Sequence, residues 1–177
     1  MATQGINDFK AKLVGGGARA NLFRVLCNFP TFAGGSTELA SFMIKGASLP
    51  SSVINPIEVP IRGGRKLKVA GDKTFEPWNI TVINDTGMEI RNAFERWSNA
   101  IENNVINTGL ETGYFADMVV EQLNRKGDVV KTYNLRGAWP SNVAAIELSY
   151  DTGDAIEEFT VELTYQYWDS PESVASA

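Results

Sequence analysis

Four carboxylates near the end of the chain have the types and spacing that best suit acid–base chemistry or cation binding. They surround a glycine-containing turn and are Asp151, Asp154, Glu157 and Glu158. Paired carboxylates can act as general acid and base, and carboxylate oxygens are ligands for calcium. Their spacing is not that of a calcium loop, and Gly153 suits the turn itself. We therefore predict a solvated acidic hairpin here and no metal site.

The absence of histidine argues against catalysis and metal binding. None of the 177 residues is histidine, and Cys27 is the single cysteine. The chain thus lacks the commonest general base and the commonest metal ligand, and it cannot form an internal disulfide. No nucleophile and base converge in the sequence. We predict a protein that is not an enzyme and has no catalytic residues.

A glycine pattern near the N-terminus formally matches a dinucleotide-binding motif. Gly15, Gly17 and Ala20 have the spacing Gly-x-Gly-x-x-Ala, but that motif needs a strand before it and a helix after it. Here a polar segment comes first and a strand is expected next, so we predict no cofactor.

Five aromatic residues raise the possibility of a carbohydrate platform. They are Trp97, Trp139, Tyr165, Tyr167 and Trp168. Trp97, Tyr165 and Tyr167 recur at core-facing spacing, so packing is the better interpretation for them. Trp139 and Trp168 remain open.

Basic residues gather around a pair of glycines in the first half of the chain: Arg62, Gly63, Gly64, Arg65, Lys66 and Lys68. Such a cluster can bind phosphates without sequence preference, but no aromatic residues are interleaved for base stacking. Residues 1–73 hold 10 Lys and Arg against 4 Asp and Glu, and residues 74–177 hold 6 against 17. A nucleic-acid face, docking of the basic part of one copy on the acidic part of another, and simple mixing of charges in the fold all fit this asymmetry.

The elements that must carry these residues are mostly strands. Length and an apolar content of 44% suit one domain over 1–177, with an extended arm at 1–19 and a frayed tail at 169–177. No apolar run is long enough to span a membrane, and residues 1–12 lack the apolar core of a signal peptide. We expect no membrane insertion and a protein kept in a cytoplasm.

One helix is expected within the stretch 85–104, over about residues 86–103. Its apolar residues recur with the spacing of one helical face and are Ile90, Phe94, Trp97 and Ile101. Thr86 and Glu89 fit a capping box at its start, and Asn103 and Asn104 suit its exit.

A long extended hairpin is expected over about residues 53–75, with its turn at Gly63-Gly64. Pro56 and Pro60 cannot donate to a ladder, so the first arm is not a central strand of its own sheet. Because the arms bury few side chains of their own, we expect the hairpin to lie on a neighbouring subunit or a nucleic-acid backbone.

Further strands are expected at 21–29, 41–47, 77–84, 114–123, 129–135, 143–150 and 155–168, with a break at 137–140. These strands and the hairpin predict a mainly β fold, an antiparallel β-sandwich or barrel with one flanking helix. The hairpins at 118–135 and 143–168 would offer free backbone edges to neighbours.

Several segments resemble the tail tube protein family of contractile-tailed phages. They lie at 59–67, 71–78, 94–97, 137–141 and 159–168, and the resemblance spans about residues 20–168. It implies a structural virion protein that stacks as hexameric rings into a hollow tube inside a contractile sheath, through which the phage genome passes. It also implies strands that join a continuous inner barrel and a long hairpin that reaches a neighbour.

The partners implied by this resemblance are other copies, the sheath, the baseplate and terminator proteins, and the tape measure protein and DNA in the lumen. The location implied is the virion tail, after assembly in the host cytoplasm. We hypothesise that Arg62, Gly63, Gly64, Arg65, Lys66 and Lys68 lie at a subunit interface. Two alternatives stay open: the inner tube of a type VI secretion or bacteriocin-like particle, and a β-sandwich binding module for carbohydrate or nucleic acid.

Overall fold

Strands make up most of the regular secondary structure in the computed structural model, which describes residues 5–13, 15, 17–103, 109–110, 113–151 and 153–171. The elements in chain order are α1 (Ile6–Lys12), β1 (Phe23–Cys27), α2 (Thr37–Met43), β2 (Ile44–Ala47), β3 (Val53–Ile61), β4 (Arg65–Thr74), β5 (Trp78–Ile83), α3 (Glu89–Ile101), β6 (Ala116–Leu123), β7 (Val129–Val143), β8 (Glu158–Thr164) and β9 (Tyr167–Asp169). All the strand pairings are antiparallel, which confirms the predicted fold class. In the described part of the chain, no helix has the length and apolar character needed to cross a membrane.

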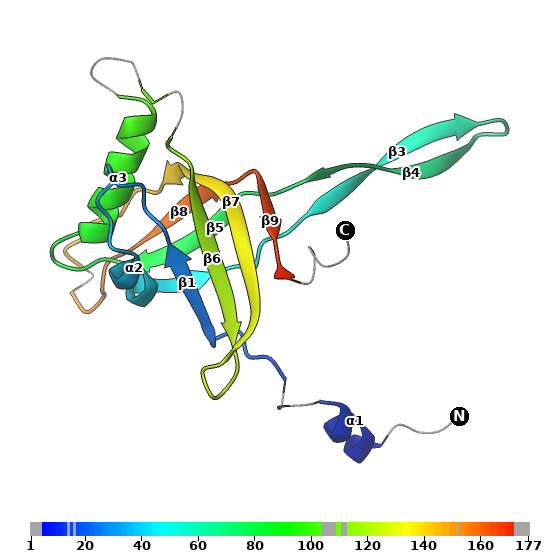
Figure 1. The fold of residues 1–177 in the computed structure, drawn as a ribbon, viewed down its shortest axis with the longest axis horizontal. Coiled ribbons are helices and arrows are strands. Elements are labelled where there is room, and N and C mark those ends of the chain that lie inside the picture. The colour runs from blue at the N-terminus through cyan, green and yellow to red at the C-terminus, as the bar shows by residue number, and fades with distance from the viewer. Residues whose placement is uncertain are drawn as a thin grey trace.

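The main sheet is open rather than closed. Its strands follow the order β1-β6-β7-β8-β5-β2, with β9 also paired to β7 (Figure 1). No pairing joins β1 to β2 among the described strands, so the expected barrel is not closed within this chain. Helix α2 packs against both of these edge strands, and the Thr37 hydroxyl donates to the Cys27 carbonyl at 2.8 Å. The helix therefore occupies the position where direct pairing would complete the ring of strands.

Strand β7 belongs to both halves of the sheet, which corrects the expected break at 137–140. Its first part pairs with β6 and β9, and its last part pairs with β8. Gly137 at the corner has φ 61°, a left-handed value that suits glycine because it has no Cβ. The register shifts just after Pro140, where a missing N–H is tolerated. The strand bends at the corner without ending.

The expected last hairpin is also different. Residues 144–150 contain no strand, and Leu148 and Tyr150 are exposed there, so no sheet face buries their alternation. The expected strand 155–168 starts later and is interrupted: β8 ends at Thr164, and β9 continues along β7 in the same direction and register, with Trp168 opposite Leu135. The predicted core-facing residues Phe159, Val161, Leu163 and Tyr165 are buried, whereas Tyr167, beyond the interruption, is exposed.

Helix α3 has the predicted apolar face, with Ile90, Phe94 and Trp97 buried against the sheet. The predicted capping box is wrong. The N-cap is Met88, in a left-handed conformation with φ 50°, and its side chain makes no cap hydrogen bond. Asp85 instead accepts from the Glu89 N–H at 3.1 Å, because residues 85–88 form a turn ahead of the helix. The helix exits at Glu102, and Asn104 lies outside the described residues.

Two short helices were not expected. Helix α2 replaces the first part of the predicted strand 41–47, because Ser36 caps it by accepting from the Leu39 N–H at 3.2 Å. Helix α1 lies inside the predicted extended arm, where Asp8 accepts from the Gly5 N–H at 3.1 Å. None of the α1 residues is buried, and the helix stands apart from the body (Figure 1).

Candidate assembly surfaces

The β3–β4 hairpin projects from the body and is exposed over almost its whole length (Figure 1). Residues directly opposite each other in an antiparallel pair share a face. The register places Ile57 opposite Val69 and Val59 opposite Leu67, with Ile61 next on the same face. These five side chains, all between 43% and 55% exposed, form an apolar stripe that we call the hairpin face. An exposed apolar stripe does not stabilise the folded monomer, so the hairpin face is a candidate contact surface.

The hairpin tip carries the basic residues singled out in the sequence. Gly63 and Gly64 have φ of 99° and 78°, so the predicted turn at this glycine pair is confirmed. Lys66 and Lys68 both approach Glu58 on the opposite face, at 2.5 and 3.8 Å. Arg62 and Arg65 form no ion pair with any described residue. The tip thus presents two guanidinium groups whose charge is not neutralised by any residue that the structure describes.

Aromatic side chains from the end of the chain fix the base of the hairpin. The Ser51 carbonyl accepts from the Tyr165 hydroxyl at 3.3 Å and from the Trp168 indole N–H at 3.1 Å. The Lys73 ammonium lies 5.3 Å from the centroids of both the Phe75 and Trp168 rings. Burial, followed by the charge of Glu76, raises the pKa of Tyr165, so its hydroxyl keeps its proton and continues to donate.

The free sheet edges lie only partly where they were expected. Strand β6 is paired on both sides, with β1 and β7, but residues 129–133 of β7 pair with β6 alone and β9 pairs with β7 alone. The ends of the strand order are β1 and β2. Sequence alone did not reveal this, because the order depends on which distant strands pair.

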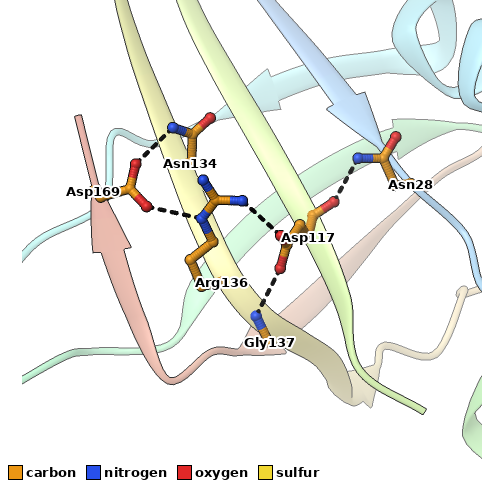
Figure 2. A network of polar contacts seen from close by, with 6 residues as sticks. All are labelled: Asn28, Asp117, Asn134, Arg136, Gly137 and Asp169. Atoms are coloured by element: carbon orange, nitrogen blue, oxygen red, sulfur yellow. Dashed lines mark hydrogen bonds and ion pairs between the residues drawn. The ribbon is translucent and has the colours of Figure 1, made fainter. Parts of the chain in front are cut away.

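A network of polar contacts crosses the outer surface of β6, β7 and β9 (Figure 2). The Arg136 guanidinium donates from Nε to Asp169 at 2.8 Å and from Nη1 to Asp117 at 2.7 Å. Asp117 also accepts from the Gly137 N–H at 3.0 Å. The Asn134 amide donates to Asp169 at 2.7 Å. The side-chain amide of Asn28, which directly follows β1, donates to the Asp117 backbone carbonyl at 2.9 Å. The network holds β9 against β7 beside the Gly137 corner.

Acid should weaken this network. Hydrogen bonds from Asn134 and then Arg136 hold the pKa of Asp169 below its ordinary value, so its carboxylate stabilises the fold above the unfolded-state pKa, about 3.9. That contribution is lost as the pH falls through the lower, folded-state value. We expect Asp169→Asn to lower the free energy of unfolding at pH 7 and to flatten its decline below about pH 4. Urea unfolding of the subunit at several pH values checks this.

Asp72→Asn is the matched control for this experiment, because Asp72 is exposed and makes no ion pair within the described part of the chain. It should leave the unfolding free energy at pH 7 nearly unchanged. Equal acid slopes for Asp169→Asn and the unsubstituted chain would contradict the prediction.

The other candidate sites from the sequence do not assemble. Within the residues that the structure describes, no group of three or more His, Cys, Asp or Glu could hold a metal. A helix precedes the Gly15–Gly17–Ala20 pattern and a strand follows it, the reverse of the dinucleotide motif. Trp97 and Tyr165 are buried, whereas Tyr167 is exposed, so the aromatic residues share no platform. Trp139 and Trp168, which the sequence left open, both pack against the core.

Comparison with known proteins identifies the family. Residues 18–170 match the family described as phage tail tube protein. The chain belongs to the phage tail tube protein family. It is 33% identical over 155 residues to tail tube protein gp19 of Enterobacteria phage T4, covering 86% of this chain and 91% of that protein. It is also 33% identical over 171 residues to the tail tube protein of Serratia phage KSP90, covering 93% of this chain and 95% of that protein.

Membership of the phage tail tube protein family settles several predictions. It confirms the resemblance and makes the chain a structural component of a phage virion tail rather than an enzyme or a ligand-binding module. The tail tube fold also matches a chain in the extended PVC sheath–tube complex with a TM-score of 0.62 at 16% identity, covering 95% of this chain and 98% of that one. It matches a chain of the anti-feeding prophage baseplate with a TM-score of 0.64 at 18% identity, covering 86% of this chain and 94% of that one. These two likenesses concern the fold alone.

Proposed function

We propose that this tail tube protein polymerises as stacked hexameric rings into a hollow conduit inside a contractile sheath, through which the phage genome passes. The observation that carries the proposal is the hairpin, which projects from the body with an exposed apolar face and an unneutralised basic tip. Stacked rings use head-to-tail contacts, in which one surface meets a different surface of the next copy. A projecting hairpin supplies one of the two surfaces such a contact needs, and its tip residues Arg62 to Lys68 lie at the subunit interface.

The partners beyond other copies follow from the same proposal. Similar folds occur in solved assemblies described as a sheath–tube complex, a baseplate and a sheath/tube terminator. By analogy, this tube contacts a sheath along its length, a baseplate at one end and a terminator at the other, with a tape measure protein and DNA in the lumen. Assembly takes place in the host cytoplasm.

The lumen wall is acidic in this proposal. The chain has a net charge of −5, and a basic wall would capture phosphates and hold DNA in place. An acidic wall leaves DNA without strong local contacts and free to slide.

Electron microscopy of the purified protein tests the proposal. We expect hollow tubes from the unaltered chain and isolated subunits or single rings after deletion of residues 60–68. Urea unfolding of the deletion variant is the folding control, because the hairpin packs on none of the buried core. Tubes of normal length from the deletion variant would contradict the role of the hairpin, and an unaltered chain that stays monomeric, even when seeded with a baseplate, would contradict the whole proposal.

The N-terminal arm should become protected when rings stack. Helix α1 exposes Ile6 and Phe9 by 76% and 67%, and these apolar groups lie on one helical face with no cover in the monomer. We expect trypsin to cleave at Lys10, Lys12 or Arg19 about tenfold more slowly in tubes than in free subunits, since proteolysis follows the population of open chain. Mass spectrometry of timed digests measures the rates, with cleavage at Lys126 in the β6–β7 turn for comparison. Equal rates at the arm in the two states would contradict the prediction.

A further inference from the structure

The segment between β7 and β8 lies on the side of the body away from the hairpin (Figure 1), and its residues line a hollow. The hollow measures about 790 Å³ and is lined by residues 145–150 and 155–158. Leu148, Tyr150 and Ile156 are 84%, 108% and 71% exposed there. Large apolar side chains this exposed are unfavourable in a free subunit and mark a surface that another protein covers. We call this region the acidic hollow, for the reason that follows.

The charged residues of segment 144–158, which lines the hollow and which we call its rim, are all acidic. Residues 144–158 hold five carboxylates and no lysine or arginine. Two of the five are engaged by the body: Glu158 pairs with Lys45 at 2.6 Å, and Glu157 accepts from the Asn84 amide at 3.0 Å. Glu147, Asp151 and Asp154 form no ion pair with the rest of the described chain.

The hairpin complements the hollow in its exposed apolar side chains and in the sign of its charge. Its apolar face ends in Arg62 and Arg65, which form no ion pair with any described residue. Each strand of the hairpin is about 30 Å long at about 3.3 Å per residue, so the tip reaches well beyond its own body. It points away from the hollow of the same chain, and the two surfaces therefore cannot meet within one copy (Figure 1).

We propose that the hairpin face and tip of one copy dock in the acidic hollow of another copy. This inference rests on the proposed function and names the surface that receives the hairpin. Val59, Ile61 and Leu67 cover Leu148, Tyr150 and Ile156, while Arg62 and Arg65 pair with the rim carboxylates. A second copy is favoured over DNA as the occupant, because a carboxylate rim repels phosphates. The contact joins two unlike surfaces, which is the head-to-tail arrangement that stacking of rings requires.

Site-specific crosslinking tests the docking. Cys27 is fully buried, and burial raises the pKa of its thiol to about 12, so introduced cysteines are the reactive thiols of the chain. One variant carries Arg62→Cys and a second carries Leu148→Cys; they are mixed, assembled under reducing conditions and then oxidised. Arg62→Cys mixed with Lys126→Cys is the matched control, because Lys126 is exposed on the β6–β7 turn.

We expect disulfide-linked dimers between Arg62→Cys and Leu148→Cys in tubes, at about tenfold the yield of the control pair, since disulfides require Cα atoms within about 7 Å. Tubes in which Arg62→Cys links to Lys126→Cys, or to neither site, would overturn the docking while leaving the proposed function standing. Failure of the unaltered chain to form any tubes would overturn both. Crosslinking of Leu148→Cys to a sheath protein instead would assign the hollow another occupant and overturn the inference.

Charge exchange gives an independent readout. Arg62→Glu with Arg65→Glu, and Glu147→Arg with Asp151→Arg, should each reduce polymer mass about tenfold, because like charges then face each other. The chain carrying all four substitutions should recover assembly, since opposite charges again meet across the contact. Urea midpoints equal to that of the unaltered chain show that each variant folds. If both double variants lose polymer mass and the variant with all four substitutions does not recover it, the docking is contradicted.

Discussion

Replacing Val59 and Leu67 together by serine should strongly weaken tube formation while leaving the subunit folded. The two residues face each other across the hairpin and are 43% and 54% exposed. Fully covering a side chain of this size stabilises a contact by about 1.5–3 kcal/mol. Because about half of each of these two side chains is already covered, losing both weakens each contact by about 1.5–3 kcal/mol. At about 1.4 kcal/mol for each factor of ten, the concentration needed for polymerisation should rise about tenfold to a hundredfold. Sedimentation across a concentration series measures it.

The same hairpin supplies a matched control. Glu58 lies one position from Val59 on the opposite side of the hairpin, where it faces Lys68. Glu58→Ser keeps the hairpin face and all the basic residues of the tip intact, and exposed ion pairs contribute about 1 kcal/mol or less. This variant should polymerise at a concentration close to that of the unaltered chain. Equal loss of assembly in both variants would show that the hairpin acts through its stiffness or charge rather than its apolar face.

Trp97→Ala should be the most destabilising single substitution in helix α3. Trp97 is fully buried, stacks on Phe94 with ring centroids 6.2 Å apart, and donates its indole N–H to the Tyr114 carbonyl at 2.8 Å. Truncating a buried tryptophan costs about 3–5 kcal/mol, and the carbonyl left without a donor adds about 1 kcal/mol or more. Because domains of this kind are stable by about 5–15 kcal/mol, we expect a large shift in the urea midpoint or failure to fold.

Two further variants make this test selective. Trp97→Phe keeps a ring but removes the N–H, so it should cost less than Trp97→Ala and leave the Tyr114 carbonyl without its donor. Glu95→Ala lies on the exposed side of the same helix and removes only the 2.7 Å contact with Arg91, which is worth about 0.5 kcal/mol. A loss for Trp97→Ala as small as that for Glu95→Ala would show that the helix does not depend on this contact.

Local patterns predicted the elements whose signal lies within one stretch of sequence. The spacing of Ile90, Phe94 and Trp97 located α3, and Gly63-Gly64 located the turn of the long hairpin. Both features depend on neighbours along the chain, so the sequence contains their cause. The helix start was misplaced, because Met88 accepts a left-handed conformation that its side chain does not favour.

Long-range pairing explains what the sequence did not reveal. The run from Phe159 to Trp168 reads as one alternating strand, but it is interrupted opposite the Gly137 corner of β7, and beyond that point Arg136 and Asn134 hold Asp169 against β7. Likewise, Gly137 looks like a strand breaker until the partners on both sides of β7 are known. The polar network had no local signal either, since its residues come from four separate segments.

The hairpin tip was predicted as a contact surface because charge and turn residues coincide there, but the hollow was interpreted only as a solvated acidic hairpin. Its strand at 143–150 was expected to bury the alternating residues, and the structure instead leaves Leu148 and Tyr150 exposed. Because a strand was expected there, the sequence did not predict the exposed apolar surface that makes this region a candidate for binding.

The two hydrogen bonds to the Ser51 carbonyl, from Tyr165 and Trp168, have a consequence for the speed and strength of assembly. They set the direction of the hairpin during folding, before any other subunit is met. A preorganised arm loses little conformational entropy on association, and that loss is one of the main terms opposing binding. Weakening these two bonds should therefore slow polymer growth even though neither aromatic residue belongs to the contacting surfaces.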